Sequence, residues 1–238
     1  MISPDPKDFM MEGPFGEYPG TYGGMKSPKP TVKVECMTYR NDAIFMGNLE
    51  GTSPGRWCES PYYAVPMNCA IAWNVLEDAG VPNILDIWCH PVQANNLRVR
   101  IKKLYRGHAK QVGHALWGSS AVSYQAKTVI VVDEDIDVYS DEDIEWAFAY
   151  RVNAEMHDIQ AFNICYGSML DPSVPLKARN VLKYGQGKWA RVLIDATVNW
   201  ELEPEEQYGG KRFPPLCTVS VPEDEELVES RWKEYGID

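Results

Sequence analysis

The spacing of apolar residues predicts four helices in the part of the chain that follows residue 60. Apolar side chains three and four positions apart indicate a helix because such residues share one helical face. The first of these runs stops at Gly80, and the third begins at Ser140, which is spaced to cap the amide of Asp143. In chain order, helices are expected from Val65 to Leu76, after Gly107, after Ser140, and from Pro222.

Strands are predicted where apolar residues alternate with polar ones or follow one another without interruption. Leu97, Val99 and Ile101 alternate with basic residues, so we expect a half-exposed strand with a basic outer face. Residues 127–132 are mostly β-branched, which is typical of a strand covered on both faces. Further strands are expected at 84–88, 159–164 and 190–194. Helices that alternate with strands predict a layered α/β domain with a mixed sheet.

The first 60 residues are rich in glycine and proline, a composition that favours loops and turns. Within them, residues 31–38 and 44–49 are expected to form strands. A second stretch rich in these residues, 51–61, predicts a domain boundary. We therefore expect three parts: residues 1–60, an α/β domain over 61–221, and a C-terminal helix over 222–238. The helix carries an apolar stripe that suits an oligomer contact, formed by Val228, Trp232 and Tyr235.

Composition excludes several classes of protein. The 238 residues include 23 Lys and Arg against 34 Asp and Glu, and the resulting net charge of −11 argues against nucleic-acid binding. No apolar run approaches the ~18 residues of a membrane span. The six cysteines include no Cys-x-x-Cys pair, which argues against a thiolate metal site. Free thiols in a reducing cytoplasm are expected.

Four segments, in their order and separations, resemble the UbiD-type carboxy-lyases. These enzymes use prenylated FMN to decarboxylate aromatic or α,β-unsaturated acids. The first segment reads Glu-Gly-Pro-Phe-Gly-Glu, and the fourth reads Ile-Asp-Ala-Thr. The resemblance covers nearly the whole chain from Glu12 and implies that residues 1–60 are the end of a split β-barrel flavin-binding domain. The segments are 12–17, 105–117, 131–138 with 146–151, and 194–197.

The resemblance implies roles for two glutamates. Glu17 would be the acid that protonates the carbon left after CO₂ departs, and Glu12 would be its partner. A carboxylic acid can do this near neutral pH only if burial or a neighbouring charge raises its pKa. Spacing alone leaves the alternative that both are solvated loop residues.

The resemblance also implies contacts with cofactor and substrate. Lys110 would reach the flavin phosphate; the alternative is a surface lysine on an amphipathic helix. Candidate residues of the substrate pocket are Pro66, Ala70, Ser168 and Met169, which otherwise simply pack. The acidic run 133–137 and the histidines at 108 and 114 are interpreted as structural, and the chain itself is expected to hold no metal.

The arginine that holds the partner glutamate lies upstream of this motif in the family, as do most ligands of the expected Mn²⁺ and K⁺. We therefore expect an upstream UbiD-like subunit or half, assembly into homo- or hetero-oligomers, and a small carboxylic acid substrate. The predicted function is the C-terminal part of a decarboxylase, which would be active only with that upstream half. The alternative is a non-catalytic assembly module or a truncated fragment of such an enzyme.

Overall fold

The computed structural model describes residues 2–3, 5–50, 59–91, 95–122, 126–179, 187–216 and 221–236. Contacts divide the chain into two compact units, Met1–Thr197 and Val198–Asp238. The predicted boundary over 51–61 falls mostly outside the described residues, so the division of the chain at residue 60 stays a prediction.

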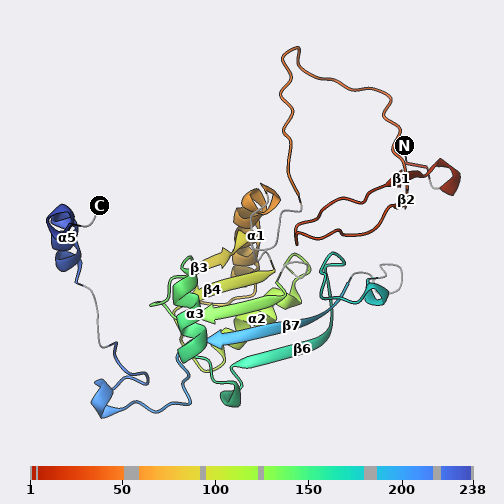
Figure 1. The fold of residues 1–238 in the computed structure, drawn as a ribbon. Helices are drawn as coiled ribbons and strands as arrows, with labels where there is room; N and C mark the ends of the chain where they lie inside the picture. Colours follow the sequence, from red (N-terminus) through yellow and green to blue (C-terminus); the bar gives the residue numbers. More distant parts are fainter. Residues whose placement is uncertain are drawn as a thin grey trace. The chain divides into compact units, whose positions relative to one another are not determined.

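A five-stranded mixed sheet forms the centre of the first unit (Figure 1). The strand order is β3-β4-β5-β7-β6, in which β4, β5 and β7 are parallel and the two edge strands are antiparallel to their neighbours. The predicted α/β class is thus confirmed. The strands are β3 (Ile84–Cys89), β4 (Asn96–Ile101), β5 (Thr128–Val132), β6 (Ile159–Gly167) and β7 (Gly187–Ala196).

Helices cover both faces of this sheet. Helices α1 and α2 pack against each other and against one face, while α3 lies on the opposite face (Figure 1). No helix among the described residues has the length and apolar character needed to cross a membrane. The three helices are α1 (Glu59–Asp78), α2 (His108–Gly118) and α3 (Asp141–Tyr150). Short 3-10 helices lie at Pro6–Asp8, Ala154–Met156, Leu176–Ala178, Glu206–Tyr208 and Trp232–Tyr235.

Strand β5 separates two hydrophobic cores. Val129 and Val131 are fully buried in the cluster formed with α1 and α2. Val132 is equally buried but belongs to the second cluster, together with Ile144 of α3. Successive side chains of a strand point to opposite faces, so a strand that is covered on both faces needs apolar residues throughout. The prediction made from the β-branched run is confirmed.

The helix ends also follow the sequence signals. Gly80 ends α1 with a φ of +70°, which an L side chain rarely adopts, and its amide donates to the Glu77 carbonyl at 2.9 Å. At the start of α3, the Ser140 hydroxyl accepts the amide of Asp143 at 3.1 Å, as the spacing predicted.

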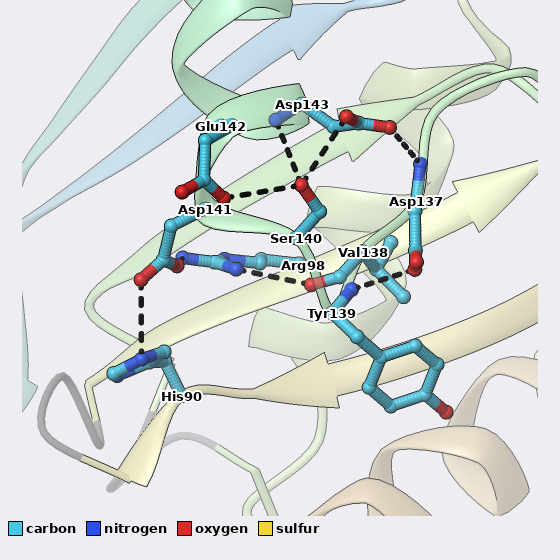
Figure 2. A network of polar contacts seen from close by, with 9 residues as sticks. All are labelled: His90, Arg98, Asp137, Val138, Tyr139, Ser140, Asp141, Glu142 and Asp143. Carbon is cyan, nitrogen blue, oxygen red and sulfur yellow. Dashed lines mark hydrogen bonds and ion pairs between the residues drawn. The ribbon is translucent and has the colours of Figure 1, made fainter. Parts of the chain in front are cut away.

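The prediction of a basic outer face on β4 was wrong. Arg98 is only 3% exposed, because the segment that leads into α3 covers this side of the strand. Its guanidinium donates to the Val138 carbonyl at 3.0 Å and to Asp141 Oδ1 at 2.5 Å, and His90 lies 3.5 Å from the same carboxylate (Figure 2). The alternation identified the strand but could not show that its polar face is buried, since buried arginine is uncommon unless it is paired.

The strands predicted at 31–38 and 44–49 are also wrong. Residues 33–40 and 43–50 form no strand, and Val32 makes only an isolated antiparallel bridge to Ile2. The apolar side chains of these segments are exposed: Val34 by 66% and Phe45 by 94%. A strand needs a hydrogen-bonding neighbour, and the described residues supply none here.

In the second unit, α5 spans Pro222–Ser230 and contains no buried residue among those described. It begins at Pro222 as predicted, but it ends before Trp232, which lies in the following 3-10 helix. The predicted apolar stripe is therefore divided between two helices. Its residues are partly exposed, Val228 by 42%, Trp232 by 45% and Tyr235 by 51%.

Candidate active site

A β-hairpin near the N-terminus carries the two glutamates. Strands β1 (Met10–Glu12) and β2 (Ser27–Lys29) pair antiparallel, so that Glu12 lies opposite Ser27. Between them the chain narrows at a bridge from Gly16 to Tyr22, and the Glu17 amide donates to the Thr21 carbonyl at 3.0 Å. Glu12 thus ends one strand, whereas Glu17 lies beside the tight turn at the hairpin tip.

Both glutamates line one cavity of about 220 Å³. The hairpin contributes most of its wall, and the loop after β6 contributes Met169 and Leu170. The cavity therefore combines two carboxylates with apolar side chains. Its lining residues are Glu12, Gly13, Phe15, Glu17, Gly23, Gly24, Met25, Ser27, Lys29, Met169 and Leu170.

The Glu17 side chain lies against the backbone of Gly23. A Cβ atom added to Gly23 would lie 2.6 Å from Glu17 Cγ, 3.1 Å from Glu17 Oε1 and 2.8 Å from Leu170 Cδ2. Only a residue without a side chain leaves this space, so Gly23 allows the carboxylate to lie between the hairpin and the loop after β6.

The pKa of Glu17 is raised above the usual value for a glutamate. Burial is the largest cause, and the negative charges of Glu50 and Glu12 add to it. Each of these effects disfavours the ionised carboxylate. The protonated form of Glu17 therefore persists to a higher pH than it would in a solvated loop.

Ser168 and Met169, both predicted as pocket residues, have different positions. Met169 lines the cavity. Ser168 is fully buried, and its hydroxyl accepts the amide of Leu170 at 3.1 Å. Ser168 therefore shapes the turn that presents the next two side chains, although it does not line the cavity itself.

The structure does not bring Pro66, Ala70 or Lys110 into this cavity. Pro66 and Ala70 are exposed and lie four residues apart on α1, which places them on one face of that helix. Lys110 lies in the first turn of α2, where Gly107 is the N-cap and no side chain caps the helix. Their predicted contacts with substrate and cofactor stay predictions.

A polar network that the sequence analysis did not identify lies where the parallel strands β4 and β7 end. Lys103 Nζ donates to Thr197 Oγ1 at 2.8 Å, and that hydroxyl donates to Asp195 Oδ1 at 2.5 Å. Asp158 is also buried, and its carbonyl accepts the Asp195 amide at 2.8 Å. Burial raises the pKa of Asp158, while the amide of Asn153 opposes the shift. Asp195 and Thr197 belong to the fourth sequence segment, but nothing in their spacing indicated Lys103 or Asp158.

The residues interpreted as structural do make structural contacts. His108 is fully buried: Nδ1 accepts the Leu104 amide at 3.3 Å, and Nε2 lies 3.0 Å from the Pro82 carbonyl. Burial lowers the pKa of His108, which favours the neutral ring. In the acidic run, Asp135 accepts two hydrogen bonds from Arg151, at 2.9 and 2.6 Å.

Among the residues that the structure describes, no group of three His, Cys, Asp or Glu side chains is arranged to hold a metal ion. The described cysteines at 36, 69, 89 and 165 form no disulfide bond. Burial raises the pKa of Cys89 to about 12, so this thiol stays protonated.

Comparison with protein families identifies the chain. The model of the 3-octaprenyl-4-hydroxybenzoate carboxy-lyase C-terminal domain matches residues 62–196, which is more than half of the sequence. The model of the Rift-related domain of the same carboxy-lyases matches residues 2–53. The chain belongs to the UbiD family.

Solved structures of UbiD-class enzymes share the fold. HmfF from Pelotomaculum thermopropionicum, in complex with FMN, is 26% identical, with a TM-score of 0.73 over 97% of this chain and 45% of its own. Vanillic acid decarboxylase (ShVdcCD) from Sedimentibacter hydroxybenzoicus, in an open form, is 27% identical and has a TM-score of 0.71. The match covers 98% of this chain and 45% of the decarboxylase chain.

An uncharacterised protein of Aeropyrum pernix is 30% identical over 240 residues, which is 98% of this chain and 44% of that protein. The chain therefore spans less than half the length of the relatives that it matches. The cavity described above is lined by both matched regions of the UbiD family. The Rift-related region supplies Glu12 and Glu17, and the C-terminal domain supplies Met169 and Leu170.

Proposed function

We propose that this chain is the C-terminal part of a UbiD-type decarboxylase that removes CO₂ from an aromatic or α,β-unsaturated acid with prenylated FMN. The observation that carries the proposal is the position of Glu12 and Glu17 on one partly apolar cavity, together with the raised pKa of Glu17. The decarboxylase that acts on vanillic acid, at 27% identity, supports an aromatic acid as the substrate class.

Glu17 is assigned the role of proton donor. Loss of CO₂ from an unsaturated carbon leaves an electron pair that an acid must protonate. A general acid works best when its pKa lies near the operating pH, and burial moves Glu17 in that direction. Burial against Gly23 and Leu170 also keeps bulk water away from one side of the carboxyl group.

Glu12 is assigned the role of partner. It ends β1, and its negative charge contributes to the raised pKa of Glu17. It is exposed, so it has room to pair with a further group. The arginine expected in this role belongs to the upstream half.

The N-terminus of α2 fits the phosphate end of a flavin. No side chain caps this helix, and a Cβ atom on Gly107 would meet nothing within 4 Å, so the approach to the first turn is open. Lys110 would add a positive charge there, and helix N-termini favour anions. When bound, the prenylated flavin would supply a sink for the electron pair that the departing CO₂ leaves on the substrate. The complex of HmfF with FMN, at 26% identity, supports a flavin.

The expected Mn²⁺ and K⁺ find no comparable fit in the described residues, because these hold no cluster of three metal-ligating side chains of the His, Cys, Asp or Glu type. We assign the ligands of both ions to the upstream half and give them no role in the chemistry of this chain.

The exposed segments 33–40 and 43–50 support an upstream partner. They carry exposed apolar side chains such as Val34 and Phe45, and the described part of the chain gives them no neighbouring strand. A second polypeptide segment that adds strands here would bury that surface and satisfy the backbone groups. We infer that the upstream half completes the split barrel in this way and that the assembled enzyme is an oligomer.

Co-expression of the chain with its upstream half and a flavin prenyltransferase tests the proposal, with CO₂ release and the visible spectrum as readouts. Glu17→Gln is expected to abolish CO₂ release and to leave the flavin bound. The matched control is Glu145→Gln, which alters an exposed carboxylate of α3 outside the cavity and is expected to retain activity. Full activity of Glu17→Gln would overturn the assignment of the proton donor.

A second candidate function is a non-catalytic assembly module. The partly exposed stripe of Val228, Trp232 and Tyr235 favours it, because such a surface can dock on another subunit. An upstream reading frame that encodes the arginine and the metal ligands would favour the enzyme. If the co-expressed halves assemble but neither bind flavin nor release CO₂, the module is the better description.

A further inference from the structure

Lys29 is a residue of the cavity for which neither the sequence motifs nor the proposed chemistry has a role. It ends β2 and pairs with Met10, while Glu12 pairs with Ser27 two positions along the same ladder. Residues two apart on a strand, and their cross-strand partners, project from one face of a hairpin. Lys29 and Glu12 are therefore diagonal neighbours on the face that borders the cavity. Among the described residues that line the cavity, Lys29 is the only one with a positive charge.

The ammonium group of Lys29 has no protein partner among the residues that the structure describes. Its side chain is exposed, and within the described ranges it forms no ion pair and no hydrogen bond, although Glu12 borders the same cavity. The flexible four-carbon side chain lets this charge move toward a bound anion.

The remaining groups of the cavity make an anion acceptable there. Burial and the neighbouring carboxylates raise the pKa of Glu17, and the positive charge of Lys29 offsets the negative charge of Glu12, its diagonal neighbour on the hairpin. The side chains of Phe15, Met25 and Leu170 provide an apolar wall. An ammonium group beside an apolar wall suits a molecule with a hydrocarbon body and one negative charge.

We propose that Lys29 binds the carboxylate of the substrate acid and so selects organic acids over their neutral analogues. This inference rests on the proposed decarboxylase function. It adds a residue of this chain to substrate recognition, which otherwise depends on the arginine expected upstream. Lys29 makes the site prefer the charged acid through a charge-assisted contact that an amide or ester cannot form.

The test is an NMR titration of the ¹⁵N-labelled chain with benzoate, and with benzamide as the uncharged probe of the same shape. Benzoate is expected to shift the amide signals of Gly23 and Gly24, which border the cavity. Lys29→Met keeps much of the apolar side chain and removes the charge, and it is expected to weaken benzoate binding roughly fivefold. Benzamide binding should not change.

Two controls separate this role from a loss of structure. Lys26→Met alters an exposed lysine outside the cavity lining and should bind benzoate as the unmodified chain does. Lys29→Arg restores a cation and should recover most of the affinity. Unchanged benzoate affinity in Lys29→Met overturns the proposal, and so does an equal loss for benzoate and benzamide.

The assembled enzyme gives a second, independent readout. Lys29→Met should raise KM for the acid roughly fivefold and change kcat by less than about twofold, because the contact acts in binding. If no acid releases CO₂ while benzoate binding still depends on Lys29, the proposed function fails and the anion contact stands. If CO₂ is released with unchanged KM in Lys29→Met, the anion contact fails and the proposed function stands.

Discussion

Replacing Gly23 with alanine should displace the Glu17 carboxylate. The backbone of Gly23 does not have a positive φ, so alanine can adopt it without strain. The effect comes from space: the new methyl group would lie 2.6 Å from Glu17 Cγ and 2.8 Å from Leu170 Cδ2. Optimal contacts between carbon atoms are ~3.5–4.0 Å, so Glu17 Cγ has to move by roughly 1 Å.

The size of the effect differs between stability and catalysis. Leu170 can move Cδ2 away by rotating about its Cβ–Cγ bond, and Glu17 can move Cγ by rotating about its side-chain bonds, at a cost of about 0.5–1.5 kcal/mol for an off-rotamer angle. The hairpin should therefore stay folded. Misplacing a reacting group by about 1 Å can lower a rate on the order of 100-fold. The expected result is a large loss of kcat with little change in the unfolding transition.

The assay compares Gly23→Ala with Gly24→Ala in the enzyme assembled from both halves. Gly24 is the neighbouring residue and also borders the cavity, but a methyl group there meets nothing within 4 Å. Flavin content, the midpoint of urea unfolding and the rate of CO₂ release are measured for both variants. If the two variants release CO₂ at the same rate, the packing of Glu17 on Gly23 does not position the proton donor.

Two further predictions concern other parts of the first unit. Ser140→Ala should lower the free energy of unfolding by about 1 kcal/mol, because it removes the hydroxyl that caps α3 at the Asp143 amide. Urea denaturation measures this change, and an unchanged unfolding midpoint would contradict the stabilising role of the cap. Glu50→Gln removes a negative charge that raises the pKa of Glu17. Since activity requires protonated Glu17 and falls as pH rises through its pKa, the descending limb of kcat/KM should move to lower pH; a limb that stays in place would argue against Glu17 as the titrating acid.

Much of the α/β core was predictable from local sequence. The helix that stops at Gly80, the cap at Ser140 and the β-branched strand over residues 128–132 each depend on residues close together in the chain. A glycine with a positive φ ends a helix, and a hydroxyl group caps the amide three residues later. Both effects involve only nearby residues, so they can be predicted without knowledge of the fold.

The predictions that were wrong share a different cause. The polar face of β4 was expected in solvent, but the segment before α3 covers Arg98 and gives it the Val138 carbonyl and Asp141 as partners. The strand expected at 31–38 has the right alternation, but the described residues provide no pairing strand for it or for 44–49. Burial of a face and pairing of a strand both depend on distant segments, about which a local pattern carries no information.

Some residues of the candidate site could be identified from local sequence, and others only from the fold. The motif with Glu12 and Glu17 could be found in the sequence because this short segment resembles a segment of the family; the spacing alone left open that both glutamates are solvated loop residues. The sequence alone also established the α/β class of the core, the end of α1 near Gly80 and the start of α3 after Ser140, since periodicity and capping are properties of neighbouring residues. Only the tertiary structure could place Leu170 against Gly23 beside Glu17, show that Gly23 leaves the space that the Glu17 side chain occupies, and add Lys29 to the lining. Those relations join residues that are far apart in the chain, and the folded chain is what brings their side chains within contact distance.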